Sequence, residues 1–176
     1  MRVRIRPATV DDVAELVQVH YTTWKDTYPR LVESVTLDDV ETRFMTQEGG
    51  LKGHEARWAD TITNKQSNHR VFLAENDDKI VGFVLPSIRE DDAGYIKALY
   101  VLPDAQGSGV GRKLLKRSLE WMKADTNPVY LTVVTTNPKA INLYKSYGFE
   151  ITGKPEWDGE GIRMDEYEMI RKAGPL

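Results

Sequence analysis

The chain has 176 residues, of which 40% are hydrophobic and 29% are charged, and its formal net charge is −3. This length suits one folded domain over residues 1–176, and the composition is that of a globular chain rather than a disordered one. The sequence contains no cysteine, which excludes disulfides, thiolate metal sites and a cysteine nucleophile.

Charge and hydropathy also limit the partners. Basic residues are interleaved with acidic ones, whereas a duplex-binding domain gathers them in a patch, so we expect no nucleic-acid partner. No apolar run approaches the roughly 20 residues that a membrane span needs, and the N-terminus lacks the apolar segment of a secretion signal. We therefore expect a cytoplasmic protein without a membrane partner. His20, His54 and His69 are too scattered for a metal-binding pair, so we expect no metal and interpret them as surface or helix-packing residues.

The chain opens with a predicted strand and helix. Val3 to Arg6 alternates apolar and basic residues, which is typical of a half-exposed strand. Thr9 can cap the helix that follows, whose apolar residues recur at helical spacing. We expect Tyr28-Pro29 to end this helix, because a residue before proline is biased away from helical geometry.

A second helical region follows. An amphipathic helix is predicted to begin near Thr36, and Gly49-Gly50 and Gly53 are predicted to break it. A further helical stretch is predicted from about His54 to Thr63.

The pattern then changes to strands. Arg70 to Glu75 and Ile80 to Ile88 are β-prone runs joined by turn residues, which predicts an antiparallel hairpin. Tyr95 to Val101 is a third strand of this group, and a helix is predicted from about Gly109 to Asp125.

The last third of the chain alternates strands with a short helix. Val129 to Val134 is apolar throughout, as in a buried strand, and Pro138 to Tyr147 predicts a helix with proline in its first turn. Phe149 to Gly153 and Asp165 to Ile170 are predicted as the final strands, with a polar loop over Lys154 to Met164. This order predicts an α/β domain with a mixed, mostly antiparallel sheet flanked by helices.

A glycine-rich segment joins the third strand of the central group to the next helix. Glycine permits positive φ and close approach of an anion, and a helix start with its positive dipole end favours phosphate. A Walker loop does not fit, since Gln106 stands where its first glycine is needed and Leu114 where it needs Ser or Thr. A dinucleotide fingerprint fits poorly, because the glycines run G-x-G-x-G. On this segment alone, a turn without a ligand is an equal alternative.

A second segment decides between these alternatives. Asn137 begins a helix that carries Tyr144 and ends in Gly148-Phe149. Together with Gln106, Gly109 and Gly111, and with the strand over residues 98–103, this order resembles the GNAT superfamily of N-acetyltransferases. The resemblance is strongest from about Arg70 to Phe149.

The resemblance implies acetyl-CoA as co-substrate and direct transfer of its acetyl group to a primary amine in a ternary complex. The acceptor would be a small molecule such as a polyamine, or a peptide or protein amine. In this family the fourth and fifth strands splay apart and the pantetheine arm enters between them. The residues implied to contact CoA are Leu99, Tyr100, Val101, Gln106, Gly107, Ser108, Gly109, Val110, Gly111, Arg112 and Asn137.

The resemblance also places Tyr144 near the thioester sulfur, as general acid toward the departing thiolate. Its alternative is a core residue, because it shares an inward helix face with Leu143 and Tyr147. A free phenol has a pKa of about 10 and a free thiol about 8.5, so full proton transfer is uphill by about 2 kcal/mol. Tyr144 must therefore be tuned or only hydrogen-bond the sulfur. Asn137 has a helix-capping alternative compatible with CoA contact.

The base is left unassigned. Exposing the lone pair of a lysine-like amine at pH 7 costs about 4.6 kcal/mol, so some group must accept its proton. Many family members carry a glutamate where this chain has Lys97. The substitutes considered are acids of two loops, each with an alternative as a polar turn residue: Asp91, Asp92, Glu156, Asp158 and Glu160.

The acceptor is expected over the thioester, between the first helices and the last hairpin loop. Trp24, Asp26 and Tyr28 lie in the first region, and Trp157 and Asp158 in the second. Aromatic and acidic groups suit a cationic amine, although ordinary packing explains them equally. A non-catalytic acyl-CoA sensor and, third, a nucleotide-binding enzyme stay as alternatives, and a homodimer is left open.

Overall fold

A computed structural model describes residues 2–64, 68–154, 156–159 and 162–176, with the side chains of residues 48 and 156–159 left undescribed. The helices are α1 (Val13–Leu31), α2 (Leu37–Met45), α3 (Gly50–Thr63), α4 (Val110–Trp121) and α5 (Pro138–Lys145). The strands are β1 (Arg4–Pro7), β2 (Phe72–Asn76), β3 (Lys79–Ile88), β4 (Gly94–Val101), β5 (Val129–Val134), β6 (Phe149–Gly153), β7 (Glu156–Gly159) and β8 (Ile162–Arg171).

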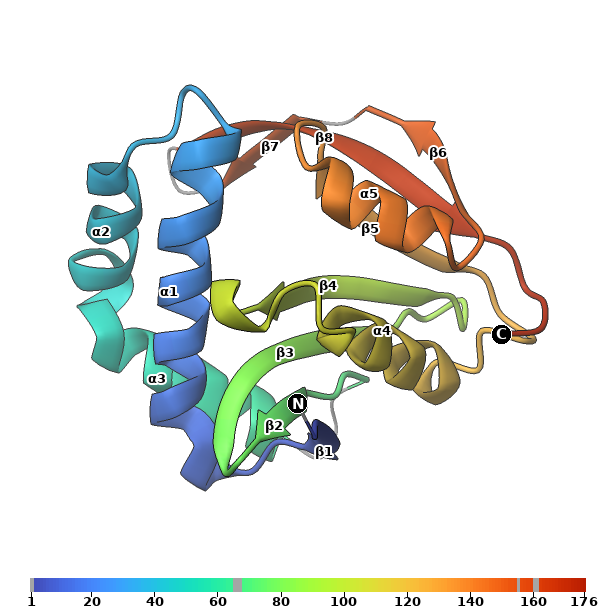
Figure 1. The fold of residues 1–176 in the computed structure, drawn as a ribbon, viewed down its shortest axis with the longest axis horizontal. Helices are drawn as coiled ribbons and strands as arrows, with labels where there is room; N and C mark the ends of the chain where they lie inside the picture. The colour runs from blue at the N-terminus through green and yellow to red at the C-terminus, as the bar shows by residue number, and fades with distance from the viewer. Residues whose placement is uncertain (1, 65–67, 155, 160–161) are drawn as a thin grey trace.

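The strands form a sheet in the order β1-β2-β3-β4-β5-β8-β6, and β7 pairs with β8 off this path. Among the described strands, only the β4–β5 pair is parallel. Helices α1 to α3 cover one face of the sheet, and α4 and α5 cover the other (Figure 1). The predicted α/β fold with a mixed, mostly antiparallel sheet flanked by helices is confirmed.

The centre of the sheet is split. β4 and β5 pair only over Gly94–Ile96 and Val129–Leu131, although β4 continues to Val101 and β5 to Val134. Figure 1 shows the two strands diverging beyond this point. The far half of β4 therefore pairs with β3 on one edge only, and its other edge faces the split.

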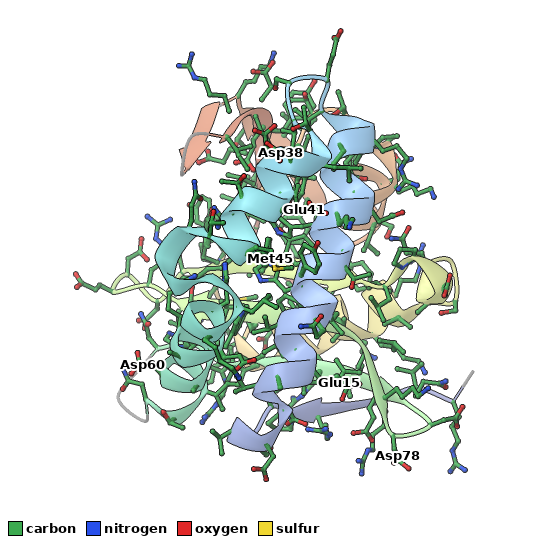
Figure 2. All side chains as sticks on the ribbon, turned by 90° about the vertical axis from the view of Figure 1, so that its left-hand side faces the viewer. Glu15, Asp38, Glu41, Met45, Asp60 and Asp78 are labelled. Atoms are coloured by element: carbon green, nitrogen blue, oxygen red, sulfur yellow. The ribbon has the colours of Figure 1, made fainter. Side chains whose placement is uncertain are left out.

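Buried side chains fill both faces of the sheet. On the α4–α5 face, residues such as Leu114, Leu115 and Phe149 form the larger cluster. On the α1–α3 face, two clusters pack under the helices. Figure 2 looks onto the outer side of these helices, where Asp38 and Glu41 of α2 and Asp60 of α3 lie on the surface.

Several local predictions are confirmed. The hairpin of β2 and β3 turns through Asp77 and Asp78, whose φ angles of 49° and 60° match a two-residue primed turn. Thr36 caps α2, accepting the Asp39 N–H at 3.1 Å. Gly148, after α5, has the left-handed φ of +83°.

The predicted end of α1 at Tyr28-Pro29 is wrong, since the helix continues to Leu31. A proline in the last turn removes only its own N–H bond, and the chain resumes hydrogen bonding at once. The Val32 N–H donates to the Tyr28 carbonyl at 2.9 Å. The C-terminal half of α1 therefore reaches the open end of the split.

Three other boundaries also differ from prediction. Gly50 and Gly53 do not break a helix but lie within α3, which begins after the left-handed Gly49. Helix α4 ends at Trp121 rather than near Asp125. The segment predicted as a polar loop over Lys154 to Met164 contains β7, which pairs with the first residues of β8. Hairpin pairing supplies the backbone hydrogen bonds there, which side-chain polarity does not reveal.

Candidate functional site

The turn between β4 and α4 exposes backbone rather than side chains. Gly107 and Gly109 have φ angles of +77° and +85°, and a Cβ added at either would meet nothing within 4 Å. The first helical bond runs from the Lys113 N–H to the Gly109 carbonyl at 3.1 Å. The three amides before it lie in the first turn of α4, where N–H groups have no intrahelical acceptor. Open space and first-turn amides together fit an anion such as a diphosphate.

Side chains of this turn brace it internally. Gln106 donates from Nε2 to the Val101 carbonyl at 3.2 Å, which ties the turn to the end of β4. Ser108 donates from Oγ to the Ala105 carbonyl at 2.6 Å. These bonds hold the backbone conformation, and the main chain is left to meet a ligand.

The start of α4 is also fixed against α5. Gly111 has helical geometry, and a Cβ there would lie 3.3 Å from Cδ2 of Leu143, so glycine permits close packing of the two helices. Arg112 donates to Oγ of Ser146 at 3.3 Å. Val110 is buried beneath the turn. The third glycine of the motif thus positions the turn instead of opening it.

The free edge of β4 presents residues to both faces of the sheet. Leu99 and Val101 pack against the α4–α5 cluster, and Tyr100 packs against the clusters under α1. Because these side chains point to the two faces of the sheet, the N–H and C=O groups of this part of β4 face the split. At its other border, Asn137 caps α5, with Oδ1 accepting the Ala140 N–H at 3.1 Å.

Tyr144 of α5 is buried among apolar side chains, with 6% of its surface exposed. Its ring lies 5.8 Å from that of Phe149, in an edge-on arrangement. Burial raises the pKa of the Tyr144 phenol well above its ordinary value, and the nearby Tyr100 adds to this. The phenol therefore stays protonated and can act as a hydrogen-bond donor.

Two hydroxyl groups join α1 to β4 beside the split. Tyr28 and Tyr100 share a hydrogen bond of 2.9 Å between their hydroxyls, and the Trp24 indole N–H donates to the Tyr100 hydroxyl at 3.1 Å. Burial raises the pKa of both tyrosines. Tyr144 interacts electrostatically with each of them, so phenols from α1, β4 and α5 gather at the opening between β4 and β5.

The structure separates the three residues predicted for the acceptor. Trp24 and Tyr28 face the split, but the Trp24 ring already carries the Arg43 guanidinium 4.6 Å from its centroid. Asp26 projects from another side of α1 and pairs with Arg30 at 3.1 Å, so it is not brought to the site. A cation–π contact of the acceptor with Trp24 is therefore a poor prediction. The side chains of Trp157, Asp158 and Glu156, and all of Glu160, lie outside the described residues.

His20 lies within an aromatic group under α1. Its ring centroid is 5.1 Å from that of Phe44, 5.5 Å from Phe83 and 5.4 Å from Tyr100. Burial lowers the pKa of His20 to about 3, and its buried Nδ1 has no hydrogen-bond partner among the described atoms. The prediction of a packing histidine is confirmed, and the ring is neutral at physiological pH.

Two of the acids considered for the base, Asp91 and Asp92, lie in the turn between β3 and β4. Asp91 accepts the Ala93 N–H at 3.2 Å, and Asp92 has a left-handed φ of 63°. Lys97 is exposed where the β3–β4 register shifts, just past the last residue of β4 that pairs with β5. None of these side chains reaches the group of phenols.

Glu166 is a carboxylate that the sequence interpretation missed. It lies on β8 directly opposite Val134 of β5. Burial raises its pKa, against an opposing hydrogen bond from Thr132, and it interacts electrostatically with Tyr28 and Tyr100. The alternation of β8 puts Met164 and Glu166 on one face, but the sequence does not show that this face is buried.

A cavity of about 530 Å³ lies beside this end of the split. It is lined by the α1–α2 connection, the end of β5 and the start of β8, over Leu31–Ser34, Val134–Thr136 and Arg163–Asp165. Val134, one of its lining residues, is the strand partner of Glu166. Through Val134 and Met164, the cavity adjoins the cluster against which Tyr28 and Tyr100 pack.

The described residues contain neither a membrane-spanning helix nor a metal-binding cluster. In the part of the chain that the structure describes, no helix has the length and apolar character to cross a membrane. Within the same ranges, no group of three or more His, Cys, Asp or Glu side chains could hold a metal ion.

Comparison with known proteins agrees with this geometry. The model of the "Acetyltransferase (GNAT) family" matches residues 34–149. The uncharacterized N-acetyltransferase YuaI of Bacillus subtilis is 25% identical over 93% of this chain and 90% of its own length. An N-alpha-acetyltransferase of Sulfurisphaera tokodaii is 28% identical over 84% of this chain and 80% of its own.

Among solved structures, the PaiA N-acetyltransferase of Thermoplasma acidophilum in complex with coenzyme A aligns with a TM-score of 0.78 and 22% identity, over 98% of this chain and 99% of that one. This likeness concerns the fold. The family match covers more than half of the residues and includes the split, the glycine turn and Tyr144. The chain belongs to the acetyltransferase (GNAT) family.

Proposed function

We propose that this protein transfers the acetyl group of acetyl-CoA directly to a primary amine, with both substrates bound at the split between β4 and β5. Family membership makes the chain an acetyl-CoA-dependent N-acetyltransferase. What we propose beyond this is which residues bind the substrates and which kind of amine accepts the acetyl group. The observation that carries them is the meeting of the glycine turn, the free edge of β4 and the Tyr144 phenol at one opening.

The residues present fit CoA in two places. The open backbone at Gly107 and Gly109, with the amides of the first turn of α4, would hold the diphosphate. The unpaired edge of β4 from Leu99 to Val101 would pair with the amides of the pantetheine arm, as a strand edge pairs with an added strand. When bound, CoA supplies a thioester whose carbonyl carbon is the electrophile. The bonds that Gln106 and Asn137 make within the protein hold these surfaces in shape.

Tyr144 would stabilise the departing sulfur. Full transfer of the phenol proton to a free thiolate is uphill by about 2 kcal/mol even for ordinary pKa values. Burial makes the Tyr144 phenol a still weaker acid, because it raises the pKa further. A hydrogen bond donated to sulfur as negative charge develops needs no proton transfer, and it strengthens in the transition state.

The acceptor is proposed to be a cationic primary amine that enters through the cavity beside Val134. Two relatives are named N-alpha-acetyltransferases, and one structural neighbour is a spermidine N-acetyltransferase chimera from Vibrio cholerae and hSSAT. Both kinds of name imply a primary amine as acceptor, carried by a peptide chain in one case and by a polyamine in the other. Without a cysteine in the chain, a cysteine-linked acyl-enzyme is excluded, which favours direct attack.

The test is substitution of Tyr144 by phenylalanine, which keeps the ring against Phe149. CoA release is measured with a panel of polyamines, lysine amides and short peptides. We expect turnover to fall about a hundredfold, as for loss of one donor to a developing anion, with acetyl-CoA binding by calorimetry nearly unchanged. Tyr130→Phe is the matched control, because it removes a phenol hydroxyl from the end of β5 that still pairs with β4. Full turnover in Tyr144→Phe would remove this residue from the mechanism, and binding without turnover on any amine would indicate a sensor.

A further inference from the structure

The group that accepts the proton of the attacking amine has not yet been assigned at this site. Lys97 stands where the family resemblance implies a glutamate in many members, and it lies exposed at the bulge of β4. An amine that arrives protonated must lose a proton before its nitrogen can attack a carbonyl carbon. A group that accepts this proton must lie on the acceptor side of the split and be reachable from the cavity.

We propose that Glu166 binds the ammonium group of the acceptor and takes the proton from its nitrogen. This inference rests on the proposed function and names the base for it. In the step, the nitrogen lone pair forms the new C–N bond and the C–S bond breaks, with its electron pair going to sulfur. The nitrogen loses two protons in all, one from the ammonium before attack and one as the amide forms, and the carboxylate of Glu166 receives each in turn and passes it to solvent. The Tyr144 hydroxyl hydrogen-bonds the departing thiolate, which takes a proton from solvent on release.

Strand geometry places Glu166 on the acceptor face. Ile162 and Met164, the preceding residues on the same side of β8, are buried with Trp24 under α1. Val134, which faces Glu166 across the β5–β8 pair, belongs to the same cluster. Tyr28 and Tyr100 pack against this cluster, so the carboxylate points to the side where their hydroxyls meet.

Glu166 and Tyr144 flank the same pair of hydroxyls. Glu166 on the α1 face interacts electrostatically with Tyr28 and Tyr100, and Tyr144 from the α4–α5 face interacts with both as well. A proton acceptor and a hydrogen-bond donor thus lie on opposite sides of the opening between β4 and β5. Direct attack needs a base within reach of the nitrogen and a hydrogen-bond donor within reach of the sulfur, since both atoms are bound to the same carbon in the tetrahedral adduct.

The surroundings of Glu166 differ from those of neighbouring acids on β8. Asp165 pairs with Lys154 at 3.3 Å, and Glu168 accepts the Thr152 hydroxyl at 3.1 Å. Among the described residues, no lysine or arginine forms a salt bridge with Glu166. The groups that face it are Tyr28 of α1, Tyr100 of β4 and Thr132 of β5, and Arg43 of α2 acts on Tyr100. A partly buried carboxylate without a cation of its own is suited to receive one from the substrate.

The test compares Glu166→Gln with Glu168→Gln, which removes a carboxylate from the same face two residues farther along β8. With the best amine of the panel, we expect kcat/KM of Glu166→Gln to fall about a hundredfold and its pH profile to lose the rise that ionisation of Glu166 causes. The loss shrinks for an alanyl peptide amide, whose α-amine has a pKa of about 8, relative to a lysine-like amine of about 10.4. Glu168→Gln keeps wild-type rates within twofold.

A readout that needs no acceptor accompanies the kinetics. Because burial raises the pKa of Glu166, its ionisation destabilises the folded state as pH rises above the ordinary glutamate value. Glu166→Gln therefore melts at a higher temperature than wild type at pH 7, and Glu168→Gln does not. An unchanged pH profile, or an equal loss in both variants, overturns the assignment of Glu166 while wild-type turnover still stands. Failure of the wild type to bind acetyl-CoA overturns the proposed function instead. Independently of any substrate, an unchanged melting temperature of Glu166→Gln contradicts the burial of this carboxylate.

Discussion

The two sides of β4 build their surfaces from different parts of the chain. On the α4 side, the glycine turn offers backbone amides, and its side chains are turned to internal bonds such as that of Gln106 to Val101. On the α1 side, the surface consists of side chains from three elements, Tyr28, Tyr100 and Glu166. A backbone surface suits the constant part of a substrate, and a side-chain surface suits a part that varies between enzymes. We therefore expect CoA binding to be weakened by substitutions that change the backbone of the glycine turn, and acceptor binding by substitutions that remove side-chain groups on the α1 side.

The glycine turn gives the largest expected effect, through Gly109→Ala compared with Gly49→Ala. Both glycines have a φ of +85° and open space at the Cβ position, so both variants pay the same backbone strain of about 1 kcal/mol. Only Gly109→Ala covers the amides of the turn. Losing one or two charge-assisted bonds of about 1.5–3 kcal/mol each weakens acetyl-CoA binding by about ten- to a hundredfold or more. Calorimetry with acetyl-CoA measures this, and equal affinities of the two variants would refute a backbone-built site.

Tyr100→Phe tests the opposite side with the second-largest effect. Tyr100 belongs to the free edge of β4, whose main chain we propose to bind CoA, and its hydroxyl bonds to Trp24 and Tyr28. Removing the hydroxyl leaves the Trp24 indole N–H and the Tyr28 hydroxyl without this partner, at a cost of about 1–3 kcal/mol. We expect the melting temperature to fall and the KM for the amine to rise about tenfold, with unchanged affinity for acetyl-CoA. A matching loss of acetyl-CoA affinity would show that the side chain also faces the cofactor.

The same division explains what the sequence could predict. Glycines at required backbone positions are visible as letters, so the turn at Gly107 and Gly109 was predicted with its phosphate chemistry. The strands before and after it in the chain, β4 and β5, were predicted within a few residues, since both have clear strand patterns. The parallel pairing that stops after Ile96 was implied only by the family resemblance, because no local pattern encodes where two strands separate.

The acceptor side was predicted less well for a physical reason. Its residues are distant in sequence, and the sheet order that places β8 beside β5 is not written in any segment. Asp26 was predicted from its closeness to Trp24 along the chain, but two residues along a helix point to different sides. Glu166 was missed because it looked like one of several acids in a strand of alternating charge. Its distinction is burial, which only the packed structure reveals.

His20, in the aromatic region under α1, is expected to make a smaller contribution, which is to the pH dependence of folding stability. The pKa of His20 is lowered from 6.5 to about 3, so the folded state disfavours its charged form. The stabilisation is present above pH 6.5 and is lost as pH falls toward 3, by roughly 1 kcal/mol per pH unit. Wild type should thus lose stability between pH 6.5 and 4.5, and His20→Phe should lose less. Chemical denaturation across this range measures the slope. His69→Gln is the control, and an equal slope in His20→Phe would mean that other groups cause the acid sensitivity.

Lys97 gives the smallest expected effect, although it stands where related enzymes carry a glutamate. Its side chain is exposed at the β4 bulge, and the base that we propose is Glu166 on β8. Lys97→Ala should therefore change kcat/KM by less than twofold and leave the pH profile unchanged. The rate is compared with the best amine of the panel from pH 6 to 9. A fall of tenfold or more would place Lys97 in contact with a substrate and would move the acceptor from the α1 face to the split edge of β4.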